Sequence, residues 1–382
     1  MTDIIFKLDP EIIIGTGTIN RVGTISGAGN RVLIITEQGL RGSPDITRLT
    51  AILDDSGAEG IVFDDIPVQA TAEAAEAAAE LARGACCSAI IGFGGLKTQA
   101  IARTTAIIAN SKLGIYDFLD GKKPQGTVIP YIAVPTTSRD PFLFSGQFVL
   151  TDPRDRLVKQ VTSPSGICIT AIIDSSITES QSGTPAAAFD GFCIAVEAYC
   201  SNKAHFMSDA LLEQALTLYA NIMDAQVNNQ TEDLSKDLME RSAHAGFLAS
   251  LGAAVSTPGI GTALAYSLSS RFTVEKAACS TVLLPPILDR LVTARPEKMA
   301  RVATLIDETV TGDPVAESAQ KAPEAIRRRM EQLQVPSHLN DFNLSLDRLV
   351  PAAEAARNLE FVAHSPWTVA VEDAYDLLKQ AF

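Results

Sequence analysis

The sequence lacks long apolar runs and any excess of basic residues, and each absence excludes a class of protein. No segment in its 382 residues is apolar for long enough to predict a bilayer-spanning helix. Only 31 lysines and arginines stand against 45 aspartates and glutamates, which gives a net charge of −14. That charge argues against duplex DNA or an anionic membrane as a partner. We therefore expect a small-molecule substrate, with no nucleic-acid or membrane partner.

Cysteine and histidine are too scattered to form a recognisable metal site. The six cysteines lie mostly inside apolar runs, and Cys86 and Cys87 are too close for an ordinary disulfide, so we expect buried, reduced thiols. The opening MTDIIFKLDP has acidic residues where a secretory leader needs a basic end. Both features predict a cytoplasmic protein. The four histidines show no paired spacing and are interpreted as structural: His205, His244, His338 and His364.

Length and composition indicate an ordinary globular chain with more than one domain. In the first half, short β-branched segments alternate with helical ones. Strands are predicted over 31–36, 61–63, 89–91 and 127–134, with helices over 71–83 and about 98–110. Such alternation is typical of a parallel sheet that helices cover on both faces. The N-terminal part is therefore predicted to be a doubly wound, Rossmann-like α/β domain.

After Asp174 the pattern becomes helical. Apolar residues recur at three- and four-residue intervals, and strand-like segments are few. Helices are predicted over 186–200, 208–227, 235–254, 259–270, 297–310, 315–333 and 370–381. A turn-rich stretch from Ser180 to Pro185 separates the two patterns. We therefore predict an α/β domain over residues 1–180 and a helical domain over residues 181–382.

Two features of the first half are candidates for binding a nucleotide. Gly92-Phe93-Gly94-Gly95 follows a strand and opens a helix, where backbone N–H groups and the helix dipole favour a phosphate, although a tight turn needs glycine anyway. A P-loop is excluded because Leu96 stands where that motif needs glycine. Glu37 closes the 31–36 strand. It is either a carboxylate that binds ribose hydroxyls and repels a 2′-phosphate, or a solvated loop residue.

Asp190 is the candidate acid of the second half. It lies in the first turns of the helix predicted over 186–200. One interpretation is that it faces a cleft and contacts a cation or a substrate hydroxyl. The other is that it is an acid near a helix N-terminus, stabilised by the helix dipole.

Several segments, in order, resemble the iron-containing (group III) alcohol dehydrogenase family of the dehydroquinate synthase-like superfamily. GFGGLKTQAIA matches the family's GGGSxxDxAKA motif, and AVPTTSRDPFLFSGQFVLTD at 133–152 fits its AVPTTAGTGSEVTxFAVITD stretch. FDGFCIAVEAYCSNKAHFMSDAL at 189–211 and the stretch at 259–286 match two further family motifs without gaps. The likeness begins at Ile14-Gly15-Thr16-Gly17 and runs nearly end to end. It implies that NAD(P) binds between an α/β domain and a helical, metal-binding domain.

The family holds one divalent metal with an aspartate and three histidines, and most of these ligands are absent here. Carried over by the resemblance, the aspartate is Asp190, and the histidine positions hold Ile194, Thr262 and Lys276. Tyr266 replaces a further histidine of the family's cleft. Iron and zinc prefer several imidazole or thiolate donors, and an ammonium repels them. We therefore expect no metal at this site.

The nucleotide site implied by the resemblance is altered as well. Phe93 replaces the family's middle glycine, Thr98 its helix aspartate and Ile101 its lysine. The residues expected to bind NAD, or else NADP, are Glu37, Gly92, Gly94, Gly95, Thr136 and Thr137. Glu37 falls where the family often has a ribose-binding aspartate, which favours NAD over NADP.

These observations together predict an NAD(P)-linked alcohol or aldehyde oxidoreductase that works without a metal. Lys276 is the candidate for polarising the carbonyl, with Asp190 as its partner and Tyr266 as a proton donor. Arg139 and Thr262 are the candidate substrate contacts. Family members usually form dimers or larger assemblies, so a homodimer is expected.

Two alternatives stay open at this point. Lys276 and Asp190 form a simple internal ion pair if the protein has lost catalysis and only binds a nucleotide or an anion. An enzyme that catalyses a different reaction on the same fold would use Arg139, Lys203 and Lys276 as an anion pocket.

Overall fold

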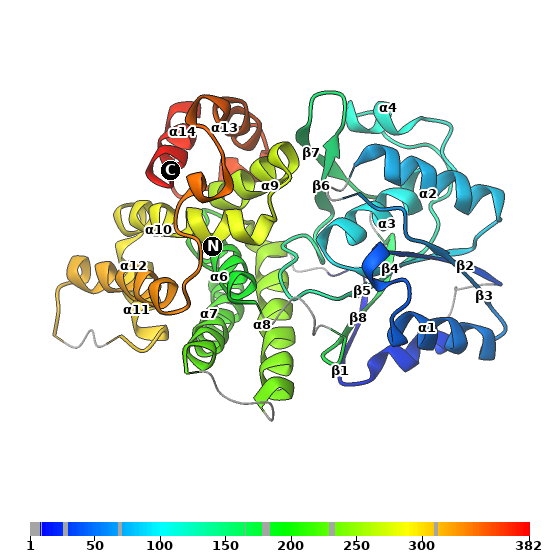
Figure 1. Ribbon diagram of the computed structural model, residues 1–382, viewed down its shortest axis with the longest axis horizontal. Coiled ribbons are helices and arrows are strands. Elements are labelled where there is room, and N and C mark those ends of the chain that lie inside the picture. Colours follow the sequence, from blue (N-terminus) through cyan, green and yellow to red (C-terminus); the bar gives the residue numbers. More distant parts are fainter. Residues whose placement is uncertain are drawn as a thin grey trace. The chain divides into compact units, whose positions relative to one another are not determined.

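The computed structural model describes residues 8, 10–25, 30–67, 71–164, 166–177, 184–228, 234–308 and 312–382 (Figure 1). By its internal contacts the chain separates into two compact units. The α/β unit comprises Met1–Thr137 and Phe142–Ser180, and the helical unit comprises Ser138–Pro141 and Gln181–Phe382. The domain boundary predicted near residue 180 lies outside the described residues and stays a prediction.

The α/β unit is built on a six-stranded parallel sheet with the strand order β1-β8-β5-β4-β2-β3. Its strands are β1 (Glu11–Gly15), β2 (Arg31–Thr36), β3 (Glu59–Phe63), β4 (Ala89–Gly94), β5 (Tyr131–Pro135) and β8 (Cys168–Asp174). From β2 the chain goes to the edge strand β3 and then crosses to β4 on the other side of β2. The direction of winding therefore reverses between β2 and β4, which confirms the predicted doubly wound α/β class.

Helices cover both faces of this sheet (Figure 1). They are α1 (Pro44–Asp55), α2 (Ala72–Gly84), α3 (Leu96–Ile108) and the short α4 (Ile115–Leu119), with 3-10 turns η1 (Thr18–Thr24) and η2 (Gln38–Leu40). Thr71 caps α2, since its side chain accepts a hydrogen bond from the Ala74 N–H.

Strand β4 shows how side-chain alternation divides the two faces. Phe93 is 1% exposed and packs with Ile91 in the apolar core that Leu49 and Leu53 of α1 complete. Gly92 points the other way, where a Cβ would come 2.9 Å from both Ala102 and Gln99 of α3. The phenyl ring that replaces the family's middle glycine therefore lies in the core and does not occupy the turn after β4.

An antiparallel hairpin of β6 (Gln147–Asp152) and β7 (Leu157–Thr162) was not predicted from the sequence. The stretch before it is fixed by Arg103 of α3. The Arg103 guanidinium donates hydrogen bonds to the carbonyls of Phe142, Leu143 and Ser145 and lies over the Phe148 ring. These bonds satisfy carbonyls of an irregular segment that has no ladder of its own.

The helical unit contains no strand among the described residues, which confirms the predicted change of class. Its helices are α6 (Pro185–Cys200), α7 (Phe206–Val227), α8 (Leu234–Ser256), α9 (Ile260–Phe272), α10 (Lys276–Ala294), α11 (Pro296–Leu305), α12 (Val315–Gln332), α13 (Val350–Arg357) and α14 (Val371–Gln380), with 3-10 turns η3 (Leu339–Phe342), η4 (Leu346–Arg348) and η5 (Glu360–His364). Residues 187–200 of α6 are all buried, so this helix forms the centre of the unit.

Helix α10 is the described helix that, by length and composition alone, reaches the threshold for a membrane span. However, 67% of that apolar window is buried inside the protein. Helices α8 and α9 reach the threshold only as a pair, and they are bent by 108°. Burial of this extent is typical of a core helix.

Candidate functional site

The winding reversal of the α/β unit brings together the residues predicted to bind a nucleotide. Strand β2 ends at Thr36 and is followed by Glu37, whereas the neighbouring β4 ends at Gly94 and is followed by Gly95 and helix α3. In open α/β sheets, ligands bind outside the carboxyl ends of the strands at such a reversal point. The structure thus places Glu37 beside the glycine turn.

Glu37 is not a solvated loop residue. Its side chain is 16% exposed, and Oε1 accepts hydrogen bonds from the Gly95 N–H at 3.1 Å and the Thr98 hydroxyl at 3.3 Å. The Lys97 ammonium lies 3.5 Å from its other oxygen. The carboxylate therefore sits at the N-terminus of α3, where the helix dipole favours negative charge. The contributions of Thr98 and Lys97 were not predicted.

The same edge of the sheet carries two buried hydroxyls without a partner. The Oγ1 atoms of Thr36 and Thr137 are buried and have no hydrogen-bond partner in the structure. Thr136, the chain neighbour of Thr137, donates its N–H to the Gly94 carbonyl. Buried polar atoms are rarely left unsatisfied, and such atoms call for an explanation such as a missing ligand or water. Hydroxyls beside a glycine turn fit the polar part of a nucleotide.

The helical unit holds a buried cluster of charged side chains centred on Asp190 of α6. The Lys276 ammonium, at the start of α10, donates to Asp190 Oδ1 at 2.6 Å, and Arg139 Nη1 donates to Oδ2 at 3.1 Å. Asp190 is fully buried, and Lys276 and Arg139 are each 6% exposed. Arg139 also reaches Glu275, which is 65% exposed. Asp190 is therefore an ion-pair partner inside the protein, not an acid of the first helical turn.

The electrostatics of this cluster keep Asp190 ionised. Burial by itself raises the pKa of the Asp190 carboxyl, but the charges of Lys276 and Arg139 outweigh burial and hold that pKa below its usual value. Two cationic side chains therefore face one carboxylate in the interior.

Arg139 enters the cluster from a short segment that packs with the helical unit. The Tyr219 phenol of α7 donates to the Ser138 carbonyl at 2.7 Å, and the Ser250 hydroxyl of α8 donates to the Asp140 carbonyl at 2.6 Å. Gly246 allows close approach, since a Cβ there would lie 2.2 Å from the Ser138 oxygen. Three contacts from two helices thus fix the position of Arg139.

Tyr266 of α9 lies beside Lys276, with the ammonium 4.9 Å from the ring centroid. This is a cation–π distance. Burial, together with the negative charges of Asp140 and Asp190, raises the pKa of the Tyr266 phenol well above its usual value. The phenol is therefore a weaker acid than an ordinary tyrosine, which weakens the case for Tyr266 as the proton donor.

Thr262 and Lys203, two other residues singled out in the sequence, lie apart from this arrangement. The Thr262 hydroxyl donates to the buried Glu197 at 2.7 Å, and Glu197 also accepts the N–H groups of Gly259, Gly261 and Thr262. Glu197 thus caps helix α9, a role that the sequence did not reveal. Lys203 is exposed in the turn after α6, unlike the buried Arg139 and Lys276.

Comparison with known proteins identifies the family. The model of the iron-containing alcohol dehydrogenases matches residues 9–175, and the C-terminal model of the Fe-containing alcohol dehydrogenase family matches residues 184–382. The chain belongs to the iron-containing alcohol dehydrogenase family. It is accordingly an alcohol dehydrogenase-like oxidoreductase, as predicted.

Relatives of this family member align over most of its length. The 1,3-propanediol dehydrogenase of Klebsiella pneumoniae is 26% identical over 322 residues, which is 83% of this chain and 82% of the relative. The NAD-dependent methanol dehydrogenase of Bacillus methanolicus is 22% identical over 98% of this chain and 99% of its own. The crystal structure of a 1,3-propanediol oxidoreductase superposes with a TM-score of 0.91 at 23% identity and covers 100% of both chains. That likeness confirms the fold.

The donor set of this family member does not fit the family's iron. At the positions that the resemblance assigns to the metal, Asp190 offers a carboxylate, Ile194 a hydrocarbon, Thr262 a hydroxyl that Glu197 already holds, and Lys276 an ammonium. Within the described part of the chain, no three His, Cys, Asp or Glu side chains come together as a metal would require. Both oxygens of Asp190 face cations instead. Transition metals need several imidazole or thiolate donors, which this site lacks.

Proposed function

We propose that the protein is an NAD-linked alcohol or aldehyde oxidoreductase that works without a metal, with Lys276, which replaces one of the family's metal ligands, taking over the electrostatic role of the metal. The observation that carries the proposal is the buried bond between Lys276 Nζ and Asp190 Oδ1 at 2.6 Å. The Lys276 side chain is thereby held against Asp190, at a sequence position where the resemblance places a metal ligand. The donor set argues for the metal-independent form of the reaction.

NAD is the proposed cofactor, and the α/β unit supports it. When bound, its nicotinamide donates or accepts the hydride. The glycine turn and the unpartnered Thr36 and Thr137 hydroxyls support a nucleotide at this edge of the sheet, whereas the Glu37 carboxylate already accepts the Gly95 N–H at the α3 N-terminus. Glu37 at the end of β2 favours a free ribose hydroxyl and disfavours a 2′-phosphate. The relative from Bacillus methanolicus is named as NAD-dependent, in agreement with this choice.

The proposed work of Lys276 is to stabilise negative charge on the substrate oxygen. An ammonium has three N–H donors, and the bond to Asp190 uses one of them. A donor held in a dry interior acts on developing charge without having to reorganise. Asp190 keeps the ammonium in place, and Arg139 holds the second oxygen of Asp190 so that the carboxylate does not turn away.

A second candidate function is supported by the closed geometry of the same cluster. Lys276 and Arg139 are both paired with Asp190, and Arg139 Nε is buried without a partner. In this alternative the ion pair fills the former metal position, and the protein binds a nucleotide or a small anion without turnover.

A Lys276→Met variant separates the two functions, and Lys298 offers a matched control. Lys298 also pairs with an aspartate, at 2.8 Å from Asp209, and lies over a tyrosine ring, 4.3 Å from Tyr199. With NADH and a panel of short aldehydes, followed by loss of NADH absorbance, Lys276→Met should lower kcat/KM by about 100-fold or more. Lys298→Met should retain the wild-type value.

Two results would count against the oxidoreductase proposal. Equal turnover by the Lys276→Met and wild-type proteins would show that Lys276 takes no part in the reaction. An absence of turnover by the wild-type protein, combined with a saturable change in NADH fluorescence, would favour the nucleotide-binding alternative.

We also propose that the protein is a cytoplasmic homodimer. Strand β1 forms one edge of the described sheet, and an exposed edge strand can pair with a second copy. Light scattering of the purified protein measures the mass directly.

A further inference from the structure

Helix α3 carries a buried amide directly behind the glycine turn. Gln99 lies four residues after Gly95, in the first turns of the helix, and is 2% exposed. The family motif GGGSxxDxAKA leaves this position open, so the resemblance assigns it no role. A primary amide is costly to bury unless its donors and its acceptor find partners.

The Gln99 side chain is fully hydrogen-bonded, and its two donors bind the turn itself. Nε2 donates to the Gly92 carbonyl and to the Gly94 carbonyl, both at 2.9 Å. Oε1 accepts the phenol hydroxyl of Tyr131 on the neighbouring strand β5. Both N–H groups and the oxygen of the amide are thus in use. The amide therefore joins the end of β4 to the start of α3 in one fixed orientation.

These bonds fix the peptide group between Gly94 and Gly95. Its carbonyl accepts both Gln99 Nε2 and the Thr136 N–H, the latter at 3.0 Å. Because a trans peptide group is planar, its N–H points away from its carbonyl, and here that N–H donates to Glu37 Oε1 at 3.1 Å. A bond that holds the Gly94 oxygen therefore also sets the direction of the N–H that Glu37 accepts.

The turn needs this restraint because its glycines leave no room for stiffer residues. A Cβ at Gly94 would lie 2.5 Å from the Thr98 hydroxyl oxygen. Glycine lacks the Cβ that limits backbone rotation elsewhere, so a peptide group between two glycines rotates easily unless hydrogen bonds hold it. The Gln99 side chain supplies such bonds from behind the turn.

The position of Glu37 depends on this peptide group. Its contact with the Gly95 N–H is shorter than those with the Thr98 hydroxyl, at 3.3 Å, and the Lys97 ammonium, at 3.5 Å. The ammonium is carried by a long, flexible side chain, whereas the peptide N–H is held in place by Gln99. The direction of the Glu37 carboxylate is therefore set through Gln99.

We propose that Gln99 is a positioning residue for cofactor selection: it fixes the Gly94–Gly95 peptide group, whose N–H holds Glu37 in place to bind the ribose hydroxyls of NAD and repel the 2′-phosphate of NADP. This role rests on the proposed NAD-linked function, in which Glu37 faces the ribose. Gln99 itself lies behind the turn and needs no contact with the cofactor. Loss of its side chain should reduce the preference for NADH over NADPH and leave kcat at saturating NADH unchanged.

Gln99→Met tests this role, because it removes the hydrogen bonds and keeps the side-chain volume nearly unchanged. In titrations followed by dinucleotide fluorescence, this variant should raise the Kd for NADH by about tenfold, as expected when one well-made hydrogen bond is lost. The Kd for NADPH should rise by less than about threefold, because a loosened Glu37 also repels the 2′-phosphate less. The preference for NADH over NADPH should therefore fall.

Thr105→Val is the matched control on the same helix. It also removes a buried hydrogen bond, from the Thr105 hydroxyl to the Ala75 carbonyl of α2, but this bond does not touch the glycine turn. A purely structural role of Gln99 would lower the melting temperature of both variants and leave the NADH/NADPH preference of each unchanged. That result would overturn the proposal.

A double variant tests whether Gln99 acts through Glu37. In a Glu37→Gln background the carboxylate is absent, so adding Gln99→Met should not change the NADH/NADPH preference further. A full additional loss of preference would contradict action through Glu37. Tyr131→Phe removes the phenol that orients the Gln99 amide and should shift the preference in the same direction as Gln99→Met. It keeps the test available if Gln99→Met does not fold.

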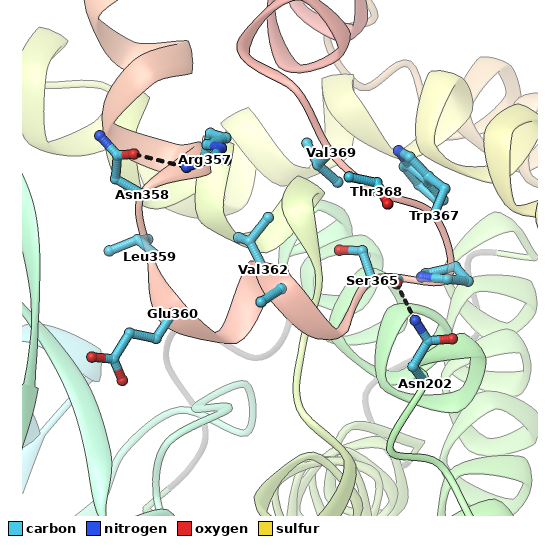
Figure 2. Close-up of a pocket in the computed structure, with 12 residues that line it drawn as sticks. Asn202, Arg357, Asn358, Leu359, Glu360, Val362, Ser365, Trp367, Thr368 and Val369 are labelled. Carbon is cyan, nitrogen blue, oxygen red and sulfur yellow. Dashed lines mark hydrogen bonds between the residues drawn. The ribbon is translucent and has the colours of Figure 1, made fainter.

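A pocket elsewhere in the protein provides a control for the place of binding. It has a volume of about 510 Å³ and lies in the helical unit, where Figure 2 shows it lined by Asn202 and by residues between 357 and 369. Arg357 is an exposed cation on its wall, so Arg357→Gln would weaken a dinucleotide bound there. We expect this variant to bind NADH and NADPH as the wild-type protein does. A loss of NADH binding would place the cofactor outside the α/β unit and overturn the proposal.

The proposed function and the role of Gln99 can fail separately. If neither NADH nor NADPH causes a saturable fluorescence change in the wild-type protein, the proposed function is refuted, and the role of Gln99 with it. If the wild-type protein binds NADH and its preference over NADPH is the same in Gln99→Met and Tyr131→Phe, the role of Gln99 alone is refuted.

Discussion

Asp190 holds a negative charge in the interior of the helical unit because Lys276 and Arg139 face its two oxygens. Removing these three ions from water carries a large desolvation penalty, which the pairing offsets. The energetic consequence is asymmetric. The intact cluster need not add stability, but loss of the shared anion leaves buried cations uncompensated.

We expect Asp190→Asn to lower the free energy of unfolding by about 3 kcal/mol, since it leaves the Lys276 ammonium buried without a counter-charge. Adding Lys276→Met to Asp190→Asn should recover at least about 1 kcal/mol of this loss, because it removes one of the unpaired cations. Urea unfolding of the two single variants and the double variant measures both quantities. Independent, additive effects of the two substitutions would contradict the coupling.

Asp152 provides a pH-dependent test in the α/β unit. Its side chain is 1% exposed, and the hydrogen bonds from Arg154 hold the pKa of its carboxyl below the ordinary value of 3.8. A lowered folded-state pKa means that the stabilisation is complete above the unfolded-state pKa and is lost as the pH falls through the folded-state value. Because Arg154 is 44% exposed, solvent weakens the pair.

The wild-type protein should therefore be more stable than Asp152→Asn by about 1 kcal/mol at neutral pH, and this difference should shrink steadily below about pH 4. Chemical unfolding at a series of pH values provides the measurement. Asp54→Asn, at an exposed position of α1, is the control and should show a small difference. A wild-type advantage over Asp152→Asn that grows toward acid pH would show that the sign is wrong.

At the scale of helices and strands, the sequence predicted elements whose signals are local. Strand β2 was predicted with its observed limits, and the helix predicted over 71–83 lies within one residue of α2 at each end. Helix α10 was missed, and it contains Pro285 and Pro286, which ordinarily interrupt a helix. It persists because nearly every residue from Ala277 to Leu288 is buried. Tertiary packing thus overrides local propensity.

The contacts of the segment Ser138–Pro141 could not be predicted from the local sequence pattern. It follows β5, yet it packs with α7 and α8 of the helical unit. Gly246 lies inside a helix where alanine has better propensity, and the structure supplies the reason, which is its approach to the Ser138 carbonyl. A glycine in a helix interior was the available signal, but its partner in the fold could not be read from the sequence.

Gly246→Ala should lower the free energy of unfolding by about 1–3 kcal/mol, because the new methyl group would overlap the Ser138 backbone. The displaced segment carries Arg139, so any NADH-linked turnover should fall as well. Gly84→Ala is the matched control, since a Cβ at Gly84 at the end of α2 would meet nothing within 4 Å. Thermal unfolding and turnover of both variants provide the measurement. If the two variants have equal stability and equal turnover, Gly246 does not help to position Arg139.

For the whole molecule, the resemblance read from the sequence predicted more than periodicity did. It identified the family and paired position 190 with position 276, more than 80 residues apart, which the structure joins at 2.6 Å. It did not predict that Arg139 binds the second oxygen of Asp190 or that Glu197 occupies the Thr262 hydroxyl. These contacts arise where the chain departs from its family, and a family pattern carries no information about the new partners.

The fold is retained while the metal ligands have changed, so restoring the ligands should restore metal binding. We expect the combined variant Ile194→His, Thr262→His and Lys276→His to bind zinc in a one-to-one ratio, because three imidazoles would join Asp190. The matched control, Ile194→His with Thr262→His, keeps the Lys276 ammonium and should bind far less. Elemental analysis after dialysis against zinc, with the accompanying rise in melting temperature, measures the difference. Stoichiometric zinc or iron in the wild-type protein under the same treatment would refute metal independence. Zinc binding by the triple variant alone would show that the side chains at these three positions decide whether the site holds a metal or the Lys276 ammonium, since the rest of the fold is unchanged.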